Sequence, residues 1–213
     1  MPRVISGQVG GLRLQAPAGE RTRPTTDRAK EAIFSVLTSR LDFSAAEVLD
    51  LFAGSGQLGI ECLSRGARRA VFVEKSRPVC ALIRSNLEHC GLAAGAELHV
   101  GDALAVLRDL VAEGRRFRCI FADPPYALVP QLRGELLERA AELLEEGGIF
   151  VLESDASGLD PGRGRPVKAG KKGRSRPVPG PETGGSGHED VNKLQEIKRC
   201  HYGVSVLSFY THK

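Results

Sequence analysis

Short apolar segments alternate with segments of helical period over residues 48–152, and no other feature of the sequence constrains the fold as strongly. Five apolar segments have the length of strands: "EVLDLF", "RAVFVE", "AELHVG", "RCIFAD" and "GGIFVLES". Runs such as "AVFV" and "CIFA" are apolar at every position, which is typical of strands covered on both faces. The sequence therefore predicts an α/β domain with a doubly wound, mostly parallel sheet and helices on both faces.

The two ends of the chain predict additions to this sheet. The C-terminal "LQEIKRCHYGVSVLSFYTHK" contains two strand-like segments with a tight link near Tyr202 and Gly203, so we expect a β-hairpin that completes the sheet edge. The N-terminal "RVISGQVGGLRLQAP" has two short β-like runs around glycines and predicts a basic β-hairpin flap over residues 1–24. The remaining chain, residues 25–213, is then a single domain.

A helix should follow the flap. Thr26 or Asp27 is suited to cap it, since both side chains accept hydrogen bonds from the first free backbone N–H groups. The apolar positions at helical spacing are Ala29, Ile33, Val36 and Leu37.

Residues 157–190 differ from the rest of the chain in composition. Glycine, proline, serine and charged residues dominate, and such a segment cannot offset its ordering entropy by burial, so we expect a flexible loop. Its stretch from Arg163 to Arg176 carries basic residues and no acid. That composition suits contact with RNA phosphates, and it suits a solvated linker equally well.

Composition sets a few further bounds. The formal net charge of +4 is a mild indication of a polyanionic partner. No segment approaches the ~20 apolar residues of a membrane span, and the N-terminus lacks the apolar core of a signal peptide, so we expect a cytoplasmic protein. The cysteines and histidines show no metal-ligand spacing, so we expect no metal and buried free thiols. The cysteines are Cys62, Cys80, Cys90, Cys119 and Cys200.

A glycine-rich turn follows the first strand-like segment. In "VLDLFAGSGQLGIE", Gly54, Gly56 and Gly59 form a G-x-G-x-x-G pattern that opens a helix. Glycines are needed where the backbone turns sharply and a ligand approaches main-chain N–H groups at the end of the first strand. A purely structural tight turn is the alternative.

Two acids follow the next two strand-like segments. Glu74 ends "RAVFVE" and can accept hydrogen bonds from both ribose hydroxyls of an adenosine-containing cofactor, which fits NAD as well as S-adenosylmethionine. Asp102 follows "HVG" and is placed to recognise an adenine amino group. For each acid, capping of the following helix is the alternative.

The fourth strand-like segment ends in Asp123-Pro124-Pro125-Tyr126. The prolines fix φ and remove two N–H donors, so a local carbonyl is left without a helical partner and can point into a pocket. A carboxylate and a carbonyl can together accept from one amino group, and Tyr126 offers a flat face on which a base can stack. A strand-ending turn is the alternative.

In this order, the motifs resemble the class I S-adenosylmethionine-dependent methyltransferases that modify amino nitrogens and carry a [D/N]-P-P-[Y/F] motif. Within that class, "RPTTDRAKEAIFSVL", "VLDLFAGSGQLGIECLSRGA" and "FADPPY" resemble the RsmD-type methyltransferases. These enzymes methylate N2 of a guanine in bacterial 16S ribosomal RNA.

The resemblance implies a class I, Rossmann-like fold and a methyl transfer from S-adenosylmethionine that yields S-adenosylhomocysteine. It implies a 16S rRNA target of the guanine-966 type within a small-subunit particle, with an RNA contact from the flap. Nothing in the sequence requires a dimer, so we expect a monomer. The cofactor-binding residues that it implies are Asp50, Phe52, Ala53, Gly54, Ser55, Gly56, Glu74, Asp102 and Ala103. The implied catalytic residues are Asp123, Pro124, Pro125 and Tyr126. The implied substrate-binding residues are Arg23, Pro24, Thr25, Arg28 and Tyr126.

Three other functions stay open at this point. A DNA adenine-N6 or protein glutamine methyltransferase can use the same tetrapeptide, although no separate target-recognition domain is evident. An NAD-binding oxidoreductase explains the glycines and Glu74 and leaves the tetrapeptide without a role. A non-catalytic RNA-binding module needs no cofactor at all.

Overall fold

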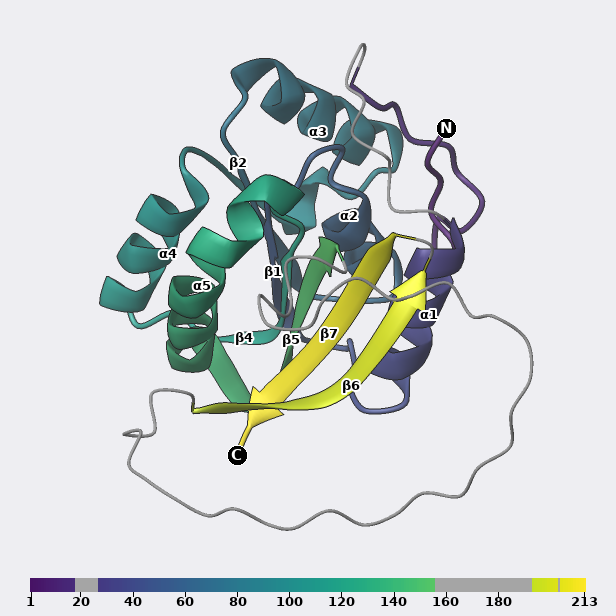
Figure 1. The fold of residues 1–213 in the computed structure, drawn as a ribbon. Helices are drawn as coiled ribbons and strands as arrows, with labels where there is room; N and C mark the ends of the chain where they lie inside the picture. The colour runs from purple at the N-terminus through teal and green to yellow at the C-terminus, as the bar shows by residue number, and fades with distance from the viewer. Residues whose placement is uncertain (18–26, 156–192, 203) are drawn as a thin grey trace, which may run out of the picture.

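A computed structural model describes residues 1–17, 27–155, 193–202 and 204–213 of the chain (Figure 1). It contains a seven-stranded sheet in the order β3-β2-β1-β4-β5-β7-β6. The strands are β1 (Glu47–Leu51), β2 (Arg69–Glu74), β3 (Ala96–Val100), β4 (Phe117–Ala122), β5 (Leu144–Asp155), β6 (Leu194–Tyr202) and β7 (Ser205–His212). Strands β1 to β5 pair in parallel, and β7 lies antiparallel to both β5 and β6. The expected doubly wound sheet and its C-terminal hairpin are confirmed.

Helices cover both faces of the sheet. They are α1 (Asp27–Thr38), α2 (Gln57–Ser64), α3 (Arg77–His89), α4 (Ala103–Ala112) and α5 (Val129–Leu143), with short 3-10 turns η1 (Ala93–Gly95) and η2 (Tyr126–Leu128). Residues of α1, α2 and α3 pack in one apolar cluster with Val48 and Phe121, and residues of α4 and α5 pack in a second cluster with Leu49 and Ile120. Alternate side chains of each central strand are therefore buried on opposite faces, as a parallel sheet requires.

The N-terminal segment packs against α2. A single antiparallel bridge joins Arg3 to Arg13, and Val4 and Leu14 are buried in the first cluster. A Cβ at Gly7, whose φ is +89°, would lie 2.0 Å from the carbonyl oxygen of Ser64, so the turn fits here because the position is glycine. The described part of the expected flap, residues 1–17, is thus a turn joined to the body of the domain. Its contact with RNA stays a prediction.

Two buried charged side chains hold this turn in place. The carboxylate of Glu61, on α2, accepts hydrogen bonds from the backbone N–H groups of Ile5 (2.6 Å) and Ser6 (3.0 Å), and from Arg65 Nε (2.8 Å). Lys30, on α1, is fully buried and donates to the carbonyl oxygen of Arg3. Burial lowers the pKa of the Lys30 ammonium. The four residues expected on the apolar face of α1 are all buried, and Phe34 and Lys30 join them.

All five cysteines are free thiols. The expected burial is confirmed for Cys62, Cys80, Cys90 and Cys119, whereas Cys200 is only partly buried. Within the described ranges, no helix has both the length and the apolar character needed to span a bilayer. The expected loop over residues 157–190 lies outside the described residues.

We predict that Glu61→Ala destabilises the protein by about 3 kcal/mol or more, because it removes the charged acceptor of two backbone N–H groups and of Arg65. Hydrogen exchange should show lost protection at residues 4–14. Glu88→Ala, on the exposed side of α3, is the matched control and should change the free energy of unfolding by less than about 0.5 kcal/mol. Equal stability of the two variants would contradict the anchoring role of Glu61.

Candidate active site

The carboxyl ends of β1, β4 and β5 bring three acidic side chains to one face of the sheet. Asp50 pairs with Phe121 across β1 and β4, and Ala122 pairs with Leu152 across β4 and β5. Continuing this register by one residue sets Asp123 beside Glu153. Since side chains alternate along a strand, Asp50, Asp123 and Glu153 share the face that α1, α2 and α3 cover.

The turn after β1 has a strained backbone. Phe52 has a φ of +58°, which side-chain-bearing residues rarely adopt, and Gly54 and Gly56 have φ of +53° and +77°. A Cβ at Gly59 would lie 2.3 Å from the Phe72 ring, so this glycine allows α2 to pack closely on β2. Ala53 and Ser55 complete the turn, where the Ala53 N–H donates to the carbonyl oxygen of Val73 (3.0 Å) and the Ser55 carbonyl accepts from Asn86 Nδ2 (3.0 Å).

The space in front of this turn suits a ligand. A Cβ at Gly54 would meet no described atom closer than the Phe52 carbonyl oxygen at 3.9 Å, so this side of the turn is open. Beside it, Glu74 accepts from the N–H of Gly54 (3.1 Å) on one carboxylate oxygen and from the N–H of Ser76 (2.8 Å) on the other. Each carboxylate oxygen can accept a second hydrogen bond, so Glu74 keeps capacity for two ribose hydroxyls. The residues present therefore fit an adenosine-containing cofactor.

Asp50 connects β1 to the first turn of α2. Its side chain is 3% exposed, and Oδ2 accepts from the N–H of Gly59 (2.9 Å), a donor that the helix itself leaves free. Burial raises the pKa of Asp50 to about 7, with the Gly59 hydrogen bond opposing this shift and the negative charge of Glu74 adding to it. The structure thus gives Asp50 an architectural contact, and its contact with a cofactor stays a prediction.

Asp102 is the N-cap of α4. Its Oδ1 accepts from the N–H groups of Leu104 (3.1 Å) and Ala105 (3.3 Å), which is the structural alternative that the sequence left open. Ala103 is buried at the start of the helix, whereas the neighbouring Val100 is 43% exposed at the end of β3. Oδ2 of Asp102 lies 3.9 Å from Lys75 Nζ in an exposed ion pair. The adenine contact expected of Asp102 and Ala103 stays a prediction.

The tetrapeptide begins where β4 ends. Asp123 is partly buried, and burial, followed by the negative charges of Glu153 and Asp50, raises the pKa of its carboxyl well above the ordinary value. The carbonyl oxygen of Pro125 accepts from the N–H of Leu128 (2.8 Å), which starts η2. The carbonyl of Pro124 accepts no backbone hydrogen bond from the described residues, so it is the one available beside Asp123.

Tyr126 is fixed by its hydroxyl group. The oxygen lies 3.1 Å from Glu153 Oε1, to which it donates, and 2.8 Å from Ser205 Oγ. Burial raises the pKa of Tyr126 to about 12, the Ser205 hydrogen bond opposes this shift, and the charges of Glu153 and Asp123 add to it. Sequence reasoning missed Glu153 and Ser205. Glu153 had a signal, because it is an acid that ends an apolar strand-like segment as Asp123 does; Ser205 had none.

Only part of the expected substrate-binding block can be placed. Arg28 lies exposed in the first turn of α1, and Arg23, Pro24 and Thr25 lie outside the described residues. The rings of Phe34 and Phe121 are 6.2 Å apart, so α1 covers β4 two residues before Asp123.

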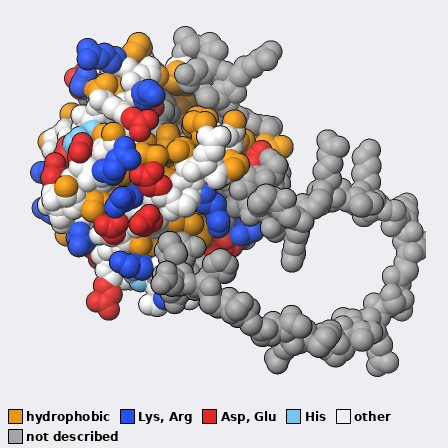
Figure 2. Space-filling view, turned by 60° about the vertical axis from the view of Figure 1, so that its left-hand side comes forward, with side chains coloured by type: hydrophobic (Ala, Val, Ile, Leu, Met, Phe, Trp, Pro, Cys, Tyr) orange, Lys and Arg blue, Asp and Glu red, His pale blue; other side chains and the backbone are white. Residues whose placement is uncertain are grey.

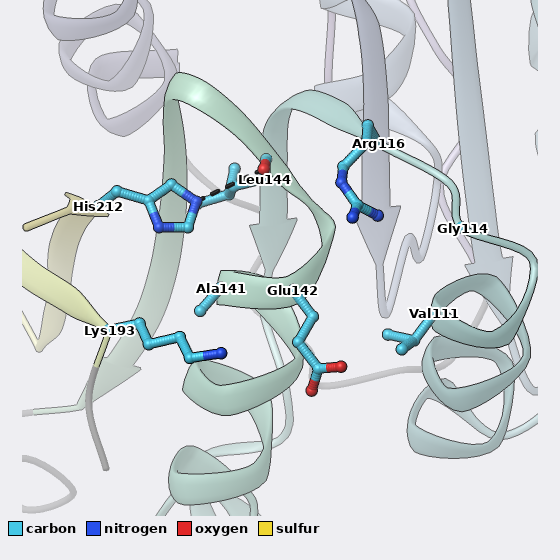
Figure 3. A pocket seen from close by; sticks show the side chains of 8 residues that line it. All are labelled: Val111, Gly114, Arg116, Ala141, Glu142, Leu144, Lys193 and His212. Carbon is cyan, nitrogen blue, oxygen red and sulfur yellow. Dashed lines mark hydrogen bonds between the residues drawn. The ribbon is translucent and has the colours of Figure 1, made fainter. Parts of the chain in front are cut away.

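A separate cavity of about 450 Å³ lies at the opposite edge of the sheet (Figure 3). Its lining is Val111, Gly114, Arg116, Ala141, Glu142, Leu144, Lys193 and His212. Leu144 begins β5 and Arg116 precedes β4, so this cavity is at the amino ends of the strands, away from the tetrapeptide. In an open α/β sheet ligands bind outside the carboxyl ends, which favours the acidic site instead.

Figure 2 shows the side of the molecule toward α4 and α5, where basic and acidic side chains are interspersed without a patch of one sign.

Comparison with known proteins identifies similar sequences. Residues 2–176 match the family described as "Conserved hypothetical protein 95". The chain is 42% identical over 154 residues to the "Putative rRNA methyltransferase YlbH" of Bacillus subtilis, a match that covers 72% of this chain and 82% of the relative. It is 37% identical over 156 residues to the "Ribosomal RNA small subunit methyltransferase D" of Escherichia coli, with 71% of each chain covered.

A solved structure is similar along the whole chain. The hypothetical protein TTHA0928 of Thermus thermophilus superposes with a TM-score of 0.73 at 28% sequence identity, and the match covers 100% of both chains.

We predict that the stability of the wild-type protein falls as the pH rises from about 4 to 7, because the folded state holds the Asp50 proton and the unfolded state releases it. The change in the free energy of unfolding that Asp50 contributes over this pH range is at most about 4 kcal/mol, since each pKa unit corresponds to about 1.4 kcal/mol. Asp50→Asn cannot ionise and keeps an oxygen that can accept from Gly59, so its pH slope in urea unfolding should be shallower. The slope should not vanish, because Asp123 remains. Identical slopes would contradict the assignment.

Proposed function

Because the chain belongs to the conserved hypothetical protein 95 family, the RsmD-type rRNA methyltransferases, we propose that it methylates N2 of a guanine in 16S ribosomal RNA. The observation that carries this proposal is the pairing of a carboxylate, Asp123, with the available carbonyl of Pro124 at the carboxyl end of β4. An exocyclic amino group has two hydrogens to donate, and these two acceptors suit it.

S-adenosylmethionine is the cofactor, and when bound it supplies a methyl carbon made electrophilic by the neighbouring positive sulfur and leaves as S-adenosylhomocysteine. On the chain, the turn from Phe52 to Gly56 would hold its methionine part and Glu74 its ribose. Asp102 and Ala103, at the end of β3, are proposed for the adenine.

The contribution of the chain to the chemistry is mainly alignment. Asp123 and the Pro124 carbonyl would each accept a hydrogen bond from the amino group and so aim the nitrogen lone pair. The Asp123 carboxylate would also offset the positive charge that develops on the nitrogen. Holding the reacting groups in one geometry can account for several orders of magnitude in rate. Tyr126 would present its ring to the base, since its hydroxyl is already held at the far end.

The exposed apolar side chains around the site support an RNA substrate with an unstacked base. Leu128, which follows the tetrapeptide, is 40% exposed, and Val204, next to Ser205, is 54% exposed. Both lie at the edge of the sheet that carries Asp123, where they could contact neighbouring bases. We propose a small-subunit particle as the substrate and a monomer as the active form. The alternative targets are DNA adenine and protein glutamine. The assay below separates them, because DNA is tested in parallel and nuclease digestion distinguishes a labelled nucleoside from label that stays in protein.

We predict that Asp123→Asn lowers methyl transfer to rRNA by at least about 100-fold, because the amide oxygen carries no charge to offset the developing cation. The assay follows a labelled methyl group into small ribosomal subunits that lack the modification, with DNA as a parallel substrate and nuclease digestion to identify the product. The expected product is N2-methylguanosine.

Asp109→Asn, on the exposed side of α4, is the matched control and should keep full activity. Asp123→Asn should be at least as stable as the wild type at pH 8, since the raised pKa means that ionised Asp123 is unfavourable in the fold. Full activity of Asp123→Asn, or label in DNA alone, would overturn the proposal.

We also predict that Gly54→Ala abolishes cofactor binding and leaves the fold intact, because the added methyl group enters the open side of the turn. The left-handed backbone should cost about 1 kcal/mol. Gly91→Ala is the matched control, with φ of +66° and no described atom within 4 Å of the added Cβ, away from the site. Calorimetric titration with S-adenosylmethionine should show normal binding for Gly91→Ala and none for Gly54→Ala; equal affinities would contradict the cofactor site.

A further inference from the structure

Glu153, at the end of β5, is a buried acid to which the mechanism so far gives no role. Its side chain is 6% exposed and lies on the face of the sheet that carries the first apolar cluster. An acid in such a place needs polar contacts to offset its lost hydration. The register of β4 and β5 sets it beside Asp123. A buried acid next to the reacting group, on a separate strand, is a candidate for more than a structural role.

The contacts of Glu153 lead directly to the tetrapeptide. Its Oε1 accepts from the hydroxyl of Tyr126 at 3.1 Å, and the same hydroxyl lies 2.8 Å from Ser205 Oγ. Tyr126 has one proton, so if it donates to Glu153, Ser205 must donate to the phenol oxygen. The result is a directed chain from the start of β7 through the tetrapeptide to the end of β5.

This chain fixes a ring that the backbone alone does not hold. Tyr126 begins η2, a single 3-10 turn, and this element follows two prolines that cannot join a sheet or helix through N–H donation. Hydrogen bonds to two strands of the rigid sheet give the side chain one orientation.

We propose that Glu153 is a positioning residue of the methyl transfer: by accepting from the Tyr126 hydroxyl, with Ser205 as the second partner, it holds the tetrapeptide in the geometry in which Asp123 meets the amino group. This inference rests on the proposed function, because it concerns the same site. It also assigns the C-terminal hairpin a part in the site, through Ser205.

The first test compares Glu153→Gln, Glu153→Ala and Tyr126→Phe in the rRNA methylation assay. Gln keeps an oxygen that can accept from Tyr126, so its kcat should stay within about 5-fold of the wild type. Ala and Phe each break the hydrogen bond and should lower kcat by about 10-fold to 100-fold, with KM for RNA and the affinity for S-adenosylmethionine within about 3-fold. Glu146→Ala, exposed at the other end of β5, is the matched control and should behave as the wild type.

The double variant Glu153→Ala/Tyr126→Phe separates a shared contact from two independent effects. If both residues act through one hydrogen bond, the double variant is no slower than either single variant. Losses that multiply, or an unimpaired Glu153→Ala enzyme, would overturn the proposal.

The pH profile adds a readout that a merely structural role would not move. Among the described residues, the groups whose charge acts on Asp123 are Glu153 on β5 and Asp50 on β1, and the phenol of Tyr126 lies on the following turn. Removing the Glu153 charge favours ionised Asp123, so the acid limb of the kcat profile of Glu153→Gln should shift to lower pH. An unshifted limb would contradict the pairing of the two acids.

A measurement that needs no activity keeps this inference distinct from the proposed function. The chain has three tyrosines, so a protein labelled with 13C at the tyrosine ring carbon that bears the hydroxyl gives a simple NMR spectrum, and Tyr126→Phe assigns one signal. Glu153→Ala and Ser205→Ala should each move the Tyr126 signal and leave that of Tyr210, which packs in the cluster on the other face of the sheet, in place. If the Tyr126 signal moves but the wild type does not methylate rRNA, the proposed function fails and the contact stands; if rRNA is methylated but the signal does not move, the inference fails.

Discussion

The parallel pairing of β4 with β1 on one side and β5 on the other is the constraint from which the rest of the site follows. Its register places Asp50, Asp123 and Glu153 on one face at the carboxyl edge. Burial raises the pKa of both Asp50 and Asp123, and the negative charges of Glu153 and Asp50 add to the shift at Asp123. An edge with excess negative charge favours ligands that carry positive charge or hydrogen-bond donors, as the proposed reactants do.

Packing around α2 stabilises the left-handed backbone of Phe52 and the buried carboxyl group of Asp50. Gly59 lets α2 approach Phe72, and the Asp50 carboxylate accepts a hydrogen bond from the N–H of Gly59. On the outer side of α2, Glu61 binds the N-terminal turn. Helix α2 therefore joins the strained turn, the sheet and the N-terminus, and it is why the left-handed Phe52 can persist in the folded state.

Much of this could be predicted from local sequence, and the parts that could not share one physical cause. The strands, the glycine turn and the tetrapeptide were found because strand alternation, left-handed backbone and proline geometry depend on near neighbours. Glu153 and Ser205 were missed because their contacts with Tyr126 span 27 and 79 positions. Lys30 was missed because a lysine at helical spacing is usually solvated, and its partner, the Arg3 carbonyl, comes from another segment.

The sequence by itself determined the order of the elements, the family motifs and which residue types could meet an amino group. The tertiary structure decided which of them face one another: that Asp102 caps α4, that Pro124 rather than Pro125 has its carbonyl available, and that Tyr126 is held by two strands. The reason is that strand register and helix packing are set by burial on both faces of the whole sheet. No local segment contains that information.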